Sequence, residues 1–225
     1  SILQHCHITL GGAGANGQVN LSNMTLLVDQ CQITGSATSG IYSGSSSAEL
    51  VILQSLLNQN GNLGLSGSIR DLKLSQTQVN NNQNGGVNFT SQSGAFIATD
   101  NCQFNDNAGN GIRSTSGSMT LSDVEVLNNN AYGVYFSSGS ITIDQSQIGN
   151  NQSDGIYLAD NETTTEITQC HIFNNNQGIS VRPSGSQNQI SNNTIQSNRS
   201  HGIYVNSGRM EISNNQIKSN NGSGI

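Results

Sequence analysis

Apolar side chains recur along this chain in short alternating runs. The clearest run is a glycine followed by Ile or Val, any residue and another apolar residue, at residues 133–136, 155–158, 178–181 and 202–205. Looser copies begin at Gly40, Gly86 and Gly111. An alternation with a period of two predicts that each run is a short β-strand with one buried face.

The runs are regularly spaced. Their first residues, which we call heads, lie at positions 18, 40, 62, 86, 111, 133, 155, 178, 202 and 224, so that successive heads are 22 to 25 residues apart. A second apolar position precedes most heads by seven residues, at Ile33, Val79, Phe104, Val126, Ile148, Ile195 and Ile217. A third run lies further upstream, as at 119–121, 141–143 and 210–212. Three short strands per repeat predict an all-β fold, a right-handed parallel β-helix of about nine coils with strands about 4.8 Å apart.

Asparagines gather between the inward positions, at residues 80–82, 105, 107, 128–130, 150–151, 174–176, 198 and 220–221. Asn tolerates the left-handed backbone conformation, and stacked Asn amides can bond along an axis. These clusters therefore predict the corners of the coils and an Asn ladder, rather than a functional site.

Composition supports an ordered but unconventional chain. Aromatic residues make up only 4% and charged residues 9% of the 225 residues. The chain therefore has few of the large side chains that fill a conventional globular core. The regular apolar positions argue against disorder. The chain has a net charge of -6 and no stripe of basic residues, which argues against binding to nucleic acids. No apolar run is long enough for membrane insertion.

The two ends of the chain both interrupt the repeat. Residue 1 is Ser rather than Met, and Gly224-Ile225 opens another head. We therefore expect residues 1–225 to be a single β-helix segment truncated at both ends from a longer protein. Uncapped terminal coils would expose strand edges, which predicts possible end-to-end self-association.

Residues 190–198 (Ile-Ser-Asn-Asn-Thr-Ile-Gln-Ser-Asn) followed by Gly202-Ile203-Tyr204-Val205 resemble the parallel β-helix repeats of the pectin lyase-like superfamily, including its NosD type. Residues 212–224 echo the same phrase. The resemblance covers nearly the whole chain. It implies the right-handed β-helix fold and a set of functions that runs from polysaccharide lyases, hydrolases and epimerases to tailspikes and adhesins. It also leads us to expect an extracellular or cell-surface location.

The four cysteines share one place in the repeat. Cys6, Cys31, Cys102 and Cys170 each lie two residues before an inward apolar residue, so we expect them to point inward as free thiols. Cys102 is three coils from Cys31 and from Cys170, about 14 Å, which is beyond disulfide reach. Cys6 and Cys31 lie on neighbouring coils, and the sequence leaves their pairing open.

The outward face of the head strands holds every tyrosine. Two residues past successive heads the column runs Asn20, Tyr42, Gly64, Asn88, Arg113, Tyr135, Tyr157, Ser180 and Tyr204, and residues just before heads include Tyr132, Asp154 and His201. Aromatic rings stack on the C–H faces of sugars while polar neighbours bond their hydroxyls. We therefore predict a glycan-binding site made by Arg113, Tyr132, Tyr135, Asp154, Tyr157, His201 and Tyr204. The alternative is that these tyrosines only pad an exposed sheet.

The residues on this face do not form a recognisable catalytic arrangement. His201 is two coils from Asp154, about 10 Å away, and no pair of neighbouring carboxylates or acid cluster for calcium occurs there. The His residues lack metal-ligand spacing, including any set for a copper role of the NosD type, so we expect no metal and no cofactor. The leading hypothesis is an extracellular or cell-surface segment, adhesin-like or tailspike-like, that binds a polysaccharide or host glycan. Part of a polysaccharide lyase, epimerase or glycoside hydrolase is one alternative, and a structural spacer or fibre element is another.

Overall fold

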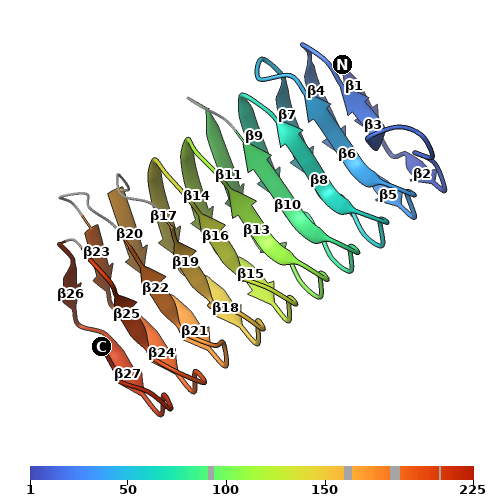
Figure 1. Ribbon diagram of the computed structural model, residues 1–225. Helices are drawn as coiled ribbons and strands as arrows, with labels where there is room; N and C mark the ends of the chain where they lie inside the picture. Colours follow the sequence, from blue (N-terminus) through green and yellow to red (C-terminus); the bar gives the residue numbers. More distant parts are fainter. Residues whose placement is uncertain (91–93, 160–163, 183–187, 208) are drawn as a thin grey trace.

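The chain folds as a solenoid of stacked coils in the computed structural model, which describes residues 1–225 except 91–93, 160–163, 183–187 and 208. The described residues form β-strands and no α-helix. Each strand pairs in parallel with its equivalents in neighbouring coils, and the two termini lie at opposite ends of the stack (Figure 1). The predicted fold class is therefore confirmed.

The first sheet is the longest and contains ten strands. One file of its inward positions includes Leu50, Leu72 and Phe96, all fully buried, and continues in register to the buried polar residues Thr165 and Asn188. Its strands are β1 (Ile2–Gln4), β4 (Thr25–Asp29), β7 (Glu49–Leu53), β9 (Asp71–Ser75), β11 (Ala95–Thr99), β14 (Ser118–Ser122), β17 (Ser140–Asp144), β20 (Thr164–Thr168), β23 (Asn188–Ser191) and β26 (Glu211–Ser213).

The second sheet follows the first in every coil and is interrupted. A pair of strands, β2 (His7–Thr9) and β5 (Gln32–Thr34), lies near the N-terminus. In the next two coils isolated bridges at Leu56 and Gln78 replace strands, so the expected three strands per coil do not occur there. The remaining six strands are β12 (Cys102–Gln103), β15 (Val124–Leu127), β18 (Gln147–Gly149), β21 (His171–Phe173), β24 (Thr194–Gln196) and β27 (Gln216–Lys218).

The third sheet contains the head strands. Val134, Ile156, Ile179 and Ile203 pair directly with one another in register and are fully buried, which confirms the predicted single interior file. The nine strands are β3 (Gly17–Leu21), β6 (Ser39–Gly44), β8 (Leu63–Ser68), β10 (Gly85–Thr90), β13 (Asn110–Ser114), β16 (Val134–Phe136), β19 (Ile156–Leu158), β22 (Ile179–Val181) and β25 (Ile203–Val205).

The predicted head at residue 62 is wrong by two positions. Leu65 is the residue that pairs with the buried Ile41, so the head of this coil is Gly64 and the outward residue is Ser66. Leu63 and Leu65 are two positions apart, so an alternating pattern fits either of them as the inward residue. Packing distinguishes them, since a Cβ on Gly64 would lie 2.3 Å from Val79 Cγ1.

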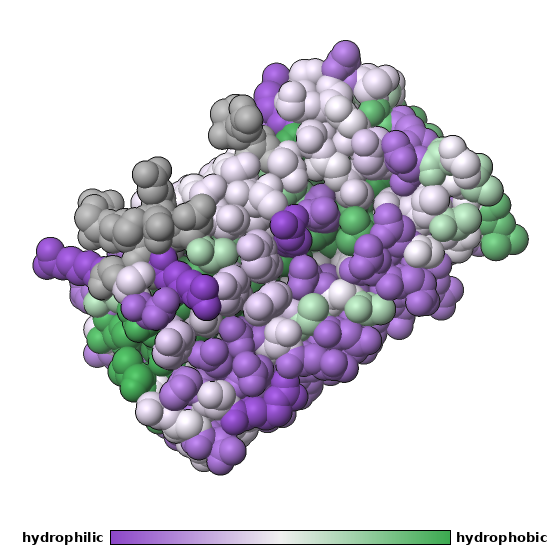
Figure 2. All heavy atoms as spheres, viewed as in Figure 1, coloured by the Kyte–Doolittle hydropathy of each residue, from purple (hydrophilic) through white to green (hydrophobic). Residues whose placement is uncertain are grey.

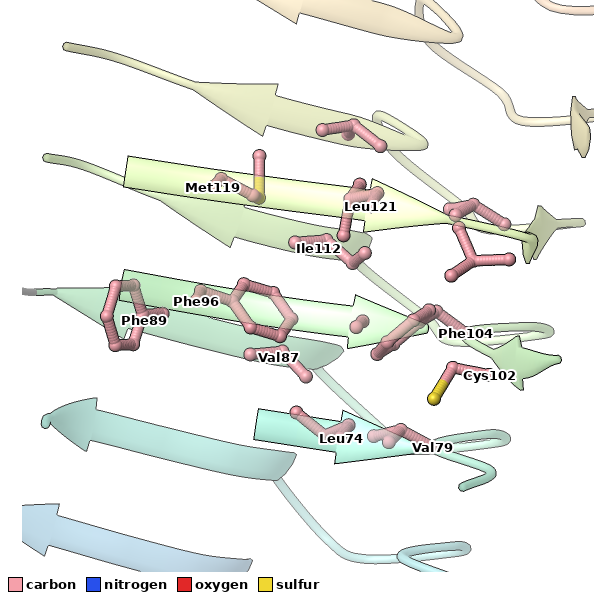
Figure 3. Packing of buried hydrophobic residues seen from close by; sticks show 14 of the residues in the cluster. Leu74, Val79, Val87, Phe89, Phe96, Cys102, Phe104, Ile112, Met119 and Leu121 are labelled. Carbon is pink, nitrogen blue, oxygen red and sulfur yellow. The ribbon is translucent and has the colours of Figure 1, made fainter. Parts of the chain in front are cut away.

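The core is a continuous column of apolar side chains between the three sheets. Phe89 lies in the third sheet, Phe96 lies in the first, and Phe104 directly follows β12 of the second. The ring centroids of Phe89 and Phe96 are 5.7 Å apart, and those of Phe96 and Phe104 are 6.4 Å apart (Figure 3). Each is fully buried. Three aromatic rings, one from each side of the coil, therefore fill the interior at this level.

The outside of the solenoid is mainly polar. Figure 2 shows hydrophilic side chains over most of the visible face and larger apolar patches near the two ends. Ile2, Leu10 and Ile225 are among the exposed large apolar residues there. None of the described residues forms a helix that is long and apolar enough to span a bilayer.

The predicted Asn ladder is confirmed at the corner between the second and third sheets. Asn129 is fully buried, and its side-chain amide donates to Asn151 Oδ1 at 3.0 Å and to the Phe104 carbonyl at 2.9 Å. Its own Oδ1 accepts from the backbone and side-chain amides of Asn107. The pattern of amide-to-amide bonds runs without a break through Asn60, Asn82, Asn107, Asn129, Asn151, Asn175, Asn198 and Asn220.

We expect Asn129→Ala to lower the free energy of unfolding by about 3 kcal/mol, because it leaves the buried Asn107 backbone amide without its acceptor and removes the side-chain donor to the Phe104 carbonyl and to Asn151 Oδ1. Urea titration followed by far-ultraviolet circular dichroism measures the change. Asn130→Ala is the matched control, since Asn130 is exposed one position away, and it should cost about 0.5 kcal/mol or less. Equal losses for the two variants would contradict a structural role for the ladder.

Candidate functional site

The outward column of the third sheet brings distant residues together. Arg113 pairs with Tyr135, and Tyr135 pairs with Tyr157, on strands β13, β16 and β19. The column continues through Ser180 to Tyr204. Because alternate residues of a strand face the same side, these side chains lie outside the file formed by Ile112, Val134, Ile156, Ile179 and Ile203.

Three tyrosine rings form a compact group on this face. Tyr132 lies just before β16, and its ring centroid is 4.9 Å from that of Tyr157 and 5.7 Å from that of Tyr135. The rings of Tyr135 and Tyr157 stack at 5.4 Å with an interplanar angle of 26°. All three side chains are half-buried, so each ring keeps part of its surface for another molecule.

An arginine lies at each side of this ring group. The guanidinium carbon of Arg113 is 5.2 Å from the ring centroid of Tyr135, and that of Arg182 is 5.6 Å from the ring centroid of Tyr157. Both distances are within the range of cation–π attraction. We call Arg113, Tyr132, Tyr135, Tyr157 and Arg182 the Tyr–Arg cluster.

Sequence reasoning did not identify Arg182. The signal was present, because Arg182 follows the outward Ser180 by two residues and period-two alternation places it on the same face. The predicted site includes only residues two positions past the heads and residues just before the heads. Arg182 is exposed, whereas Arg113 is half-buried.

A groove of about 210 Å³ continues from the cluster toward the N-terminal coils. Arg113 borders both, and its Nη1 donates to Asn88 Oδ1 at 3.2 Å inside the groove. Asn84 and Asn110 also line it. The groove therefore combines hydrogen-bonding amides and a cation beside the aromatic rings.

Asp154 lies beside the cluster but is buried at a corner. It is 5% exposed, and its Oδ1 accepts from Asn176 Nδ2 at 3.0 Å and from the Gln177 backbone amide at 3.2 Å. Burial raises the pKa of the Asp154 carboxyl, although these hydrogen bonds and the charge of Arg182 act in the opposite direction. The pKa of Tyr132 is also raised, mainly by burial and to a smaller extent by the charge of Asp154. This carboxylate supports the corner rather than presenting itself to solvent.

His201 and Tyr204 form a second, smaller aromatic group. Their rings stack with centroids 5.5 Å apart, and His201 Nδ1 accepts from the Ser223 amide at 3.1 Å. Tyr204 is two coils from Tyr157 in the register of the sheet, about 10 Å, with the buried Ser180 between them. The predicted residues thus divide into the Tyr–Arg cluster, the buried Asp154 and this separate pair.

Other parts of the surface offer less for recognition. A hollow of about 710 Å³ lies at the starts of β20, β23 and β26, on the first sheet, and is bordered by Glu166, Arg209 and Glu211. It is larger than the groove, but its described lining has no aromatic ring. Within the described parts of the chain, no three His, Cys, Asp or Glu side chains group as metal ligands.

Comparison with known proteins identifies the fold family. A family model described as right-handed beta helix region matches residues 86–225, more than half of the chain and all of the Tyr–Arg cluster. No curated protein and no solved structure matches the chain significantly.

Asp154→Asn should stabilise the protein at neutral pH. A folded-state pKa above the ordinary 3.8 means that ionised Asp154 destabilises the fold, and that this cost disappears as pH falls through the folded-state pKa toward 3.8. Asn keeps an oxygen acceptor for Asn176 and Gln177. Thermal unfolding measured from pH 3 to pH 8 should therefore give Asp154→Asn a higher midpoint temperature than the native chain at pH 7. The difference between the two midpoints should shrink in acid.

Asp106→Asn removes one negative charge at an exposed corner and controls for net charge. If Asp106→Asn raised the midpoint temperature as much as Asp154→Asn does, with the same pH dependence, burial of Asp154 would not be the source of the stabilisation.

Proposed function

The chain belongs to the right-handed β-helix family, and from that premise we propose that it uses the outer face of its third sheet to bind glycans. The family fixes a repeat architecture but does not select one activity. The choice must therefore come from the chemistry of a surface. In this chain the Tyr–Arg cluster is the surface feature that needs an explanation beyond folding.

The cluster carries the proposal because it combines two kinds of sugar contact. The half-buried rings of Tyr132, Tyr135 and Tyr157 offer apolar faces for the C–H side of a sugar ring. Arg113 and Arg182 add N–H donors for hydroxyl or carboxylate oxygens at the two edges. Simple padding of a sheet explains stacked rings, but it does not explain a guanidinium group at each side.

The ligand we propose is an extended chain rather than a single sugar. From Asn88 to Tyr204 the outward column passes through five strand spacings, about 24 Å. The groove at Asn88, the Tyr–Arg cluster and the His201–Tyr204 pair follow one another along this line. A polysaccharide or host glycan lying parallel to the solenoid axis would meet all three. This role places the protein at the cell surface or outside the cell, where such polymers occur.

We propose binding rather than bond cleavage at this face. A lyase or epimerase needs a base and an acid that reach the sugar. Among the described residues, Asp154 is the carboxylate whose charge acts on Tyr132, and it is buried and hydrogen-bonded to Asn176 and Gln177. Its oxygens are therefore poorly placed to accept a proton from a ligand on the outer face.

Tyr135→Ala and Tyr157→Ala should each weaken glycan binding about tenfold, because each removes one face of the stacked platform. A glycan array identifies a ligand, and affinity electrophoresis or calorimetry then measures the variants. Tyr42→Ala is the matched control, since Tyr42 lies on the same face three coils from Arg113 and should leave affinity unchanged. Binding that survives both cluster substitutions would reject this site. New ultraviolet absorbance from a uronate polymer would instead indicate a lyase.

Tyr204→Ala tests the extended ligand. It should reduce affinity several-fold for long oligosaccharides and leave affinity for a disaccharide unchanged, because a short ligand occupies only the cluster. Calorimetry with a length series of the array-identified glycan measures this. An equal loss at every length would contradict separate contacts along the axis.

A further inference from the structure

Cys6 and Cys31 occupy equivalent positions on neighbouring coils. Each directly follows a residue with left-handed backbone, His5 or Gln30, both with φ of 51°. Strands β2 and β5 then pair in register from His7 and Gln32 onward. Their Cα atoms are therefore separated by about one strand spacing, about 4.8 Å, which is inside the range of about 4.4 to 6.8 Å for disulfides.

The two thiols also point in the same direction. The Cys6 thiol donates to the Gln4 carbonyl at 3.3 Å, and the Cys31 thiol donates to the Asp29 carbonyl at 3.2 Å. The Cys6 backbone amide donates to Cys31 Sγ at 3.4 Å, so this sulfur reaches toward the first coil. With the Cα atoms already at disulfide spacing, we expect side-chain rotation to bring the sulfurs together without movement of the coils.

The other cysteines lack such a neighbour. The equivalent positions next to Cys102 hold Thr77 and Val124. Those next to Cys170 hold Ser146 and Asn193. Both thiols are buried, and burial raises the pKa of Cys102 to about 11 and of Cys170 to about 12. They therefore serve as an internal reference for unreactive cysteines.

Access decides which member of the pair reacts first. Cys6 is half-buried, whereas Cys31 is 1% exposed, and burial raises the pKa of the Cys31 thiol. A thiolate is the attacking species in disulfide exchange. Cys6 is thus the point of entry for an external disulfide, and Cys31 is the residue positioned to complete the exchange.

We propose that Cys6 and Cys31 form a redox site that closes to an intramolecular disulfide with a small-molecule disulfide such as oxidised glutathione. The Cys6 thiolate attacks one glutathione sulfur, breaks that S–S bond and releases one glutathione thiolate. The Cys31 thiolate then attacks Cys6 Sγ and releases the second glutathione. Two cysteine thiols are oxidised, one external disulfide is reduced, and the two protons pass to the released thiolates. The bond joins the first coil to the second and limits local opening of β2.

The test treats the full chain of residues 1–225 with oxidised glutathione, then alkylates under denaturing conditions and measures intact mass. The native chain should lose two of its four alkylatable thiols and keep no glutathione. Cys31→Ser should retain one glutathione on Cys6, and Cys6→Ser should remain unmodified. Cys102→Ser should form the disulfide as the native chain does. Serine already occupies the same slot at Ser55 and Ser146, so these variants preserve the local structure.

Hydrogen exchange provides a second measurement. Oxidation should slow exchange of the His7 to Thr9 amides at least tenfold and leave the amides of β15 unchanged. A native chain that kept glutathione on Cys6, retained all four free thiols or formed a covalent dimer would overturn the proposal. So would a disulfide in the Cys6→Ser variant.

Discussion

Each coil of this protein obtains its backbone hydrogen bonds from the coils above and below it. Ile156, for example, donates to the Gly178 carbonyl at 3.0 Å, and Val134 donates to Gly155 at 2.8 Å. Strict register is needed for this exchange, because one residue of slip would turn every apolar side chain outward. The corners preserve the register with left-handed residues such as Asn128, followed by the buried Asn ladder. A chain with few aromatic residues can therefore hold an ordered core.

The same register makes the surface for which we propose glycan binding. Arg113, Tyr135 and Tyr157 are far apart in sequence, yet successive coils place them at successive strand spacings on one face. The backbone beneath them is hydrogen-bonded to the neighbouring coils, so we expect the arrangement of these side chains to be preformed for the ligand that we propose. Such preorganisation lowers the entropic cost of binding a flexible glycan. The solenoid thus provides direction and spacing, whereas the identity of the outward side chains provides the chemistry.

The sequence predicted the fold well because its signal is repeated in every coil. It failed where one coil offered two equivalent patterns, as with Leu63 and Leu65, and packing around Gly64 decided between them. It placed the tyrosines on one face but assigned Asp154 to the ligand side, since period and spacing do not reveal that Asn176 bonds this carboxylate in a buried corner. Arg182 lies outside the outward column, two residues past Ser180, although alternation places it on the same face. Side-chain direction at corners is set by hydrogen bonds between coils, which a linear pattern does not contain.

Through-hydrogen-bond scalar couplings in solution test the coil register most directly. For an isotopically labelled chain of 23.6 kDa, the account predicts couplings from the Val134, Ile156 and Ile179 amide nitrogens to the Gly155, Gly178 and Gly202 carbonyl carbons, respectively. These three couplings together define parallel strands in one register. Couplings from the same amides to carbonyls in any other register, or in an antiparallel pattern, would contradict the stacked solenoid and the surface built on it.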